Sequence, residues 1–121
     1  MRHETAALRR VRALCLAMPE TQERQSHGEA AWFVGGKRQF VMYADRHHDE
    51  REGFWAAAPE GVQGQLVAEA TDRYFRPPYV GGRGWVGVWV DVPDVDWDRV
   101  EAIIQDAWRT VAPPTIRRLA D

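Results

Sequence analysis

Cysteine, lysine and serine each occur only once in this chain of 121 residues, as Cys15, Lys37 and Ser26. One cysteine cannot form an internal disulfide, and the four histidines do not replace the cysteines of a structural zinc site. No run approaches the roughly 20 apolar residues that a membrane span needs. Arginines interrupt the apolar residues near the start, where a signal peptide would lie. We therefore expect a cytoplasmic protein with no secretion signal and no membrane contact.

Positively charged residues are also fewer than negatively charged ones, and the formal net charge is −2. This balance excludes a general electrostatic attraction to nucleic acid or to anionic membranes, so any such binding needs a local basic patch. Apolar residues make up 45% and charged residues 28%, which is ordinary for a globular protein. The length and composition predict one domain over residues 1–121, with most of the six tryptophans in its core.

Hydrophobic periodicity predicts an α+β fold. Apolar residues recur at helical spacing in three segments, and they alternate at strand spacing in four. We expect helices at 4–18, 59–70 and 97–111, strands at 31–34, 38–43, 53–58 and 85–91, and irregular or loop segments at 21–29, 45–52 and 73–84. Gly35-Gly36 predicts a tight hairpin. The first three strands should form an antiparallel meander, joined by the later strand, with the helices packed on one face of the sheet.

The sequence gives little support for a catalytic site or a metal site. Ser26 and its neighbour His27 point apart in a regular backbone, and Cys15 lies on the apolar stripe of the first helix. The run His47-His48-Asp49-Glu50 contains metal-ligating residue types, but adjacent loop residues seldom converge on one ion. A solvated loop is the alternative interpretation. We expect no enzyme, no metal and no cofactor.

A segment at residues 73–85 is the strongest candidate for binding. Arginines alternate there with aromatic residues, a combination that contacts phosphates and stacks on bases. The alternative is a structural crossover whose aromatics cap the core and whose arginines pair with carboxylates. The candidate nucleic-acid contacts are Arg73, Arg76, Arg83, Tyr79 and Trp85, with Lys37 at the hairpin tip.

His27-Gly28 forms a second motif, between the first helix and the first expected strand. A histidine in this place can titrate near neutral pH. Alternatively, its ring nitrogens fix the loop by hydrogen bonding. The sequence leaves both interpretations open.

Several segments together, in one order, resemble the MmcQ/YjbR family of small bacterial proteins over nearly the whole chain. They are Pro19-Glu20-Thr21, His27-Gly28, Phe33-Val34-Gly35-Gly36-Lys37, Arg73-Tyr74-Phe75, Pro78-Tyr79-Val80, Gly84-Trp85-Val86, Val90-Asp91 and Ala107-Trp108. The resemblance implies an α+β fold like that of frataxin or of double-wing transcription factors, and members are usually labelled DNA-binding. His27, Gly28, Lys37, Tyr79 and Trp85 match recurring positions of the family, for which no catalytic residues are established.

Two functions follow as hypotheses. The first is a nucleic-acid-binding domain, with DNA as the partner that the resemblance implies. The second is a non-catalytic module that binds a protein or a small ligand, which fits the acidic balance and the many tryptophans. The second requires that Trp85 or Trp89 is exposed to solvent beside a groove. A monomer is the default expectation for either function.

Overall fold

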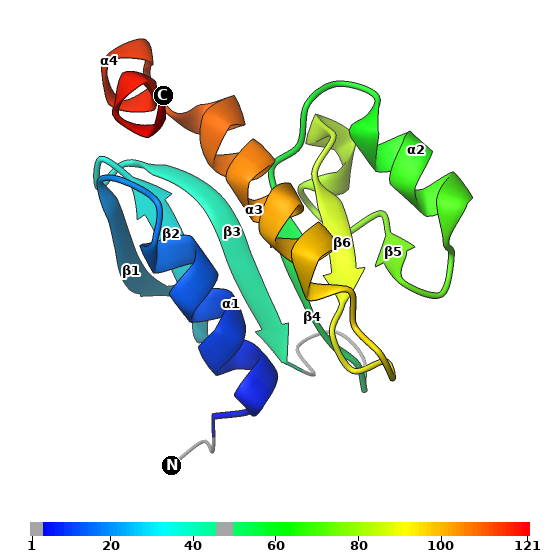
Figure 1. Cartoon of the computed structure of the whole chain (residues 1–121). Helices are drawn as coiled ribbons and strands as arrows, with labels where there is room; N and C mark the ends of the chain where they lie inside the picture. Colours follow the sequence, from blue (N-terminus) through cyan, green and yellow to red (C-terminus); the bar gives the residue numbers. More distant parts are fainter. Residues whose placement is uncertain (1–3, 46–49) are drawn as a thin grey trace.

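Antiparallel hairpins form the centre of the sheet, as the alternating residues predict. The computed structural model describes residues 4–45 and 50–121. Within them, six strands form one sheet in the order β1-β2-β3-β4-β6-β5 (Figure 1). The strands are β1 (Thr21–Ser26), β2 (Glu29–Val34), β3 (Arg38–Asp45), β4 (Glu52–Ala56), β5 (Tyr74–Phe75) and β6 (Val86–Trp89). All neighbouring strands run antiparallel, and the expected α+β class is confirmed.

Two helices lie on one face of this sheet, α1 (Ala6–Leu16) and α3 (Trp97–Val111) (Figure 1). Helix α1 begins after Thr5, whose hydroxyl accepts a hydrogen bond from the N–H of Leu8 at 3.0 Å. Helix α3 begins after Asp96, whose carboxylate accepts from the N–H of Arg99 at 3.1 Å. The other helical segments are α2 (Val62–Glu69), α4 (Pro114–Arg117) and the 3-10 turns η1 (Gly81–Arg83) and η2 (Arg118–Ala120).

The core lies between these two helices and the sheet. Trp32 on β2 and Trp108 on α3 have no exposed surface. The indole N–H of Trp108 donates to the carbonyl of Pro19 at 3.0 Å, and that of Trp32 donates to Glu23 at 3.0 Å. Both rings are therefore buried without an unpaired donor. Truncating a tryptophan buried in this way costs about 3–5 kcal/mol, which explains part of the high tryptophan count.

The turn between β2 and β3 depends on its glycines. Gly35 and Gly36 have φ angles of 62° and 73°, a conformation that glycine adopts at little cost. The backbone N–H of Lys37 then donates to the carbonyl of Val34 at 3.2 Å. The glycine pair thus places the only lysine at the end of the sheet, where the sequence predicts it.

The expectation of an irregular segment at residues 21–29 is wrong, because residues 21–26 form the edge strand β1. Its side chains are mostly exposed on both sides, so no apolar alternation marks it. Glu23 accepts the indole N–H of Trp32, and the guanidinium of Arg24 lies 4.1 Å from the ring centroid of Phe33. An edge strand held by backbone pairing and by long polar side chains carries no hydrophobic period.

The segment at 73–84 is also more ordered than expected. Tyr74 and Phe75 form β5, which pairs with β6. The ring of Phe75 stacks on that of Trp89, with centroids 3.9 Å apart. Because β5 has only two residues, alternation could not reveal it. The second helix likewise begins at Val62 rather than at residue 59.

Candidate functional site

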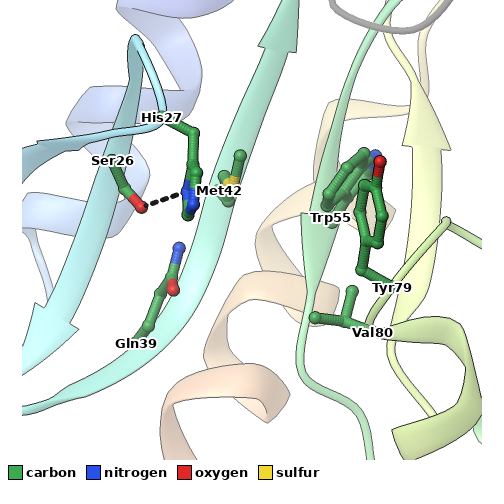
Figure 2. A pocket seen from close by; sticks show the side chains of 7 residues that line it. All are labelled: Ser26, His27, Gln39, Met42, Trp55, Tyr79 and Val80. Carbon is green, nitrogen blue, oxygen red and sulfur yellow. Dashed lines mark hydrogen bonds between the residues drawn. The ribbon is translucent and has the colours of Figure 1, made fainter.

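One face of the sheet turns away from α1 and α3 and carries a cleft of about 340 Å³. Successive side chains of a strand point to opposite faces. Tyr43 bonds to Glu52 on the side of α1, so Met42 and its cross-strand neighbour Trp55 point the other way. We call this hollow the aromatic cleft; its lining is Ser26, His27, Gln39, Met42, Trp55, Tyr79 and Val80 (Figure 2). The cleft thus opens on the sheet face opposite the two long helices.

His27 forms one wall of the aromatic cleft. It occupies the two-residue turn between β1 and β2, where His27 has φ 55° and Gly28 has φ 82°. Two successive positive φ angles identify the hairpin turn that favours Asn-Gly. The expectation that Ser26 and His27 point apart is wrong, because the positive φ of the turn brings Nδ1 of His27 to 3.0 Å from the hydroxyl of Ser26, and this contact orients the ring (Figure 2). The turn therefore fixes the histidine at the rim of the cleft.

Tyr79 forms the opposite wall, next to Trp55 and Val80 (Figure 2). It also has a positive φ angle, 65°, which is uncommon for a residue with a bulky side chain. Its side chain is 82% exposed, although Trp55 in the same wall is only 4% exposed. An aromatic side chain is therefore held at the surface by a strained backbone.

A second hollow of about 430 Å³ adjoins the first and shares Gln39 and Val80 with it. We call it the basic cleft; it is lined by Phe33, Lys37, Arg38, Gln39, Val80, Arg83, Trp85, Thr110 and Val111. The guanidinium of Arg83 lies 5.6 Å from the ring centroid of Trp85. No carboxylate appears in either lining, as far as the structure describes the chain. An aromatic hollow and a cationic hollow thus lie next to each other, with Gln39 and Val80 in the lining of both.

The cations of the basic cleft have no acidic partner among the residues that the structure describes. Lys37, Arg38 and Arg83 make no salt bridge within residues 4–45 and 50–121. Elsewhere the arginines that form salt bridges include Arg12 with Glu4 at 2.7 Å and Arg99 with Glu69 at 3.2 Å. Arg10, Arg24 and Arg76 also form no salt bridge within the described residues, so the basic cleft is distinguished by having three such cations around one hollow.

The structure brings some of the predicted contacts together and separates others. Lys37, Arg83 and Trp85 line the basic cleft, and Tyr79 lines the aromatic cleft beside it. Arg76 is exposed and packs against Gly81, where an added Cβ would lie 2.6 Å from its Cγ.

Arg73 stands apart from the basic cleft. It donates to the carbonyls of Asp94 at 3.0 Å and Pro93 at 3.2 Å. It lines a separate hollow together with Glu69, Asp94 and Asp96. Three acidic residues and Arg99 therefore share a hollow with this arginine, whereas no acidic residue of the described chain lines the basic cleft.

Sequence reasoning did not select Arg38, Gln39 or Trp55. The signal for Gln39 is a lone polar residue beside the apolar run of β3, and Arg38 follows directly after Lys37. Trp55 and Phe54 were expected on opposite faces of a strand, which the structure confirms. Only the packing of the helices shows that Trp55 belongs to the face with the cleft.

Titratable groups outside the clefts serve the fold. Burial raises the pKa of the Cys15 thiol well above its usual range, which keeps it protonated. Burial also raises the pKa of Tyr43, and its hydrogen bond to Glu52 adds to the shift. These groups are held by packing and by internal bonds, so neither offers a reactive centre.

Two further observations concern metal ligands and membrane-spanning helices. The described residues contain no group of three or more side chains able to hold a metal ion. His47, His48 and Asp49 of the candidate metal run lie outside the described residues. Of the helices described, none has both the length and the apolar character needed to cross a bilayer.

Comparison with known proteins identifies the same family that the ordered segments of the sequence indicate. A family model described as YjbR matches residues 16–110. This match spans β1 to β6 and nearly all of α3, so it includes every residue of both clefts except Val111. No curated protein and no solved structure matches the chain. Because the family model covers most of its length, the chain belongs to the YjbR family.

Proposed function

We propose that this protein binds nucleic acid through the two adjoining clefts. The observation that carries the proposal is the group of three cations, Lys37, Arg38 and Arg83, which form no salt bridge within the described residues and line a cleft beside the aromatic one. Phosphates bind to such cations, and bases stack on exposed aromatic rings. The family resemblance makes DNA the first polymer to test.

The shape of the surface favours an unpaired strand over a duplex. In a duplex the faces of the bases are stacked on one another, and proteins read only their edges in the grooves. An exposed ring at the mouth of a hollow, such as Tyr79, suits a base whose face is free. A single strand can lay its phosphates along the basic cleft while it places bases in the aromatic one.

The test is fluorescence anisotropy of a labelled 12-nucleotide single strand and of the matching duplex, at low salt. Lys37→Ala/Arg83→Ala should weaken binding to both, because it removes two of the three cations. Arg73→Ala is a control, since Arg73 lies among carboxylates outside the basic cleft. Equal binding by the parent and the double variant would refute the assignment. No binding of either polymer by the parent would refute the function.

A small anionic ligand is the second candidate. The volumes of about 340 and 430 Å³ lie within the range of small-molecule sites. This hypothesis requires an exposed tryptophan beside a groove, and Trp85 meets it only in part, because it lies beside the basic cleft but is only 6% exposed. A mononucleotide that raises the melting temperature, together with no binding of oligonucleotides, would favour this candidate. In both cases we propose binding without catalysis.

A further inference from the structure

We propose that the aromatic cleft holds a single nucleobase of the bound strand, stacked against Tyr79 and contacted at its edge by Gln39 and His27. This inference rests on the proposed function and deepens it. It assigns the base to one hollow and its phosphate to the other. If the inference holds, the affinity of the protein for a strand depends on the presence of bases as well as on the charge of the phosphates.

The first observation is the backbone conformation of the two walls. His27 and Tyr79 both adopt positive φ angles, 55° and 65°, and they face the same hollow (Figure 2). Asparagine or glycine fits such positions better than histidine or tyrosine. A residue that folding alone disfavours, found on both sides of one cleft, is evidence that the side chain serves binding.

The second observation is the polar groups left facing the hollow. Within the described residues, the carboxamide of Gln39 makes no hydrogen bond, and neither does Nε2 of His27. Both side chains point into the same space (Figure 2). The contact between Ser26 and Nδ1 leaves Nε2 for a ligand. A carboxamide offers a donor beside an acceptor, the pattern that matches the edge of a base.

The third observation is that the two clefts are neighbours with two lining residues in common. Gln39 and Val80 line both of them, so a ligand reaching from one hollow to the other passes over these residues. The ring of a nucleotide would lie on the aromatic side, and its phosphate would lie near Arg38 and Arg83. The cations of one cleft therefore lie beside the aromatic residues of the other, as the phosphate of a nucleotide lies beside its base.

The first experiment compares a strand of eight thymidines with a strand of eight abasic sites, which keeps the phosphates and removes the bases. We expect the abasic strand to bind about 5- to 150-fold more weakly, the range for the loss of one stacked base. Tyr79→Gly, which relieves the positive φ and removes the ring, should abolish most of this ratio. Asp94→Gly relieves a similar strain, φ 58°, outside both clefts and should leave the ratio unchanged.

The outcomes separate the two proposals. Equal binding of both strands by the parent overturns the base cleft and leaves nucleic-acid binding standing. Binding of neither strand overturns nucleic-acid binding and the base cleft with it. A ratio that survives Tyr79→Gly places the stacked base elsewhere and also overturns the inference.

The second experiment uses His27→Asn, because Asn-Gly is the pair that this hairpin turn favours. We expect the melting temperature to stay the same or rise. The affinity for the thymidine strand should fall severalfold, and that for the abasic strand should not change. If His27 only forms the turn, the variant will bind both strands as the parent does. That result would remove His27 from the site.

Discussion

The salt dependence of binding gives the sharpest test of where the phosphates lie. Lys37, Arg38 and Arg83 together can neutralise about three phosphates of a single strand. Each neutralised phosphate contributes about −0.7 to the slope of log K against log salt, so the parent should show a slope of about −2. Between 50 and 200 mM salt, this slope corresponds to a loss of affinity of roughly 20-fold.

Removal of the cations should flatten this slope stepwise. For Arg83→Ala we expect about −1.4, or a roughly 7-fold loss over the same salt range. For Lys37→Ala/Arg83→Ala we expect about −0.7, or a loss of roughly 3-fold. Arg73→Ala carries the same change of charge as Arg83→Ala but should keep the parental slope, because Arg73 binds carbonyl oxygens in another hollow.

Anisotropy titrations at four salt concentrations measure these slopes. The reasoning fails if the double variant keeps the slope of the parent, since its phosphates would then lie elsewhere. It also fails if Arg73→Ala flattens the slope as much as Arg83→Ala does. In that case the whole segment of arginines and aromatics binds the strand, as the sequence pattern first indicated.

Three predictions concern the fold. Gly87→Ala should destabilise the protein by about 1–3 kcal/mol in urea unfolding, because its Cβ would lie 2.2 Å from the ring of Phe75. Asp91→Asn should cost about 1 kcal/mol at pH 7, since the paired guanidinium of Arg51 lowers the pKa of Asp91. That contribution is present above about pH 4 and is lost as the pH falls further, because the folded pKa lies below the unfolded one. Cys15 should react with a thiol reagent only after unfolding, because burial raises its pKa.

Each of these predictions has its own control. Gly64→Ala lies on α2 with open space around the added Cβ, so it should stabilise the protein by up to about 1 kcal/mol. The difference between Asp91→Asn and the parent should shrink at pH 3, and a constant difference would contradict the role of the ion pair. Rapid labelling of Cys15 in the native protein would contradict its burial.

Local patterns predicted the centre of the fold well. Alternation marks β2, β3, β4 and β6 because each carries apolar side chains at strand spacing, and the glycine pair marks the hairpin that carries Lys37. The edge strands β1 and β5 escaped prediction for opposite reasons. β1 is polar throughout, and β5 is two residues long. These edge strands form by backbone pairing with the adjacent strand, and their own sequences carry no alternation of apolar residues.

The candidate site was predictable only in its parts. The sequence indicates that arginines and aromatics lie near one another along the chain. It does not show that Lys37 meets Arg83, or that His27 faces Tyr79 across a cleft. Whether these residue pairs share a cleft depends on which face of the sheet the helices cover. Trp55, assigned to a strand by its neighbours, becomes part of the cleft only because α3 packs on the other face.

The two edge strands also bear on how the protein behaves when concentrated. An unpaired strand edge invites the backbone of another molecule, and charged side chains or a short edge discourage it. β1 presents Glu23 and Arg24 along its exposed length, and β5 offers only two residues. Neither edge is a good template for further strands. We therefore expect the protein to resist edge-to-edge aggregation, although its sheet is not closed into a barrel.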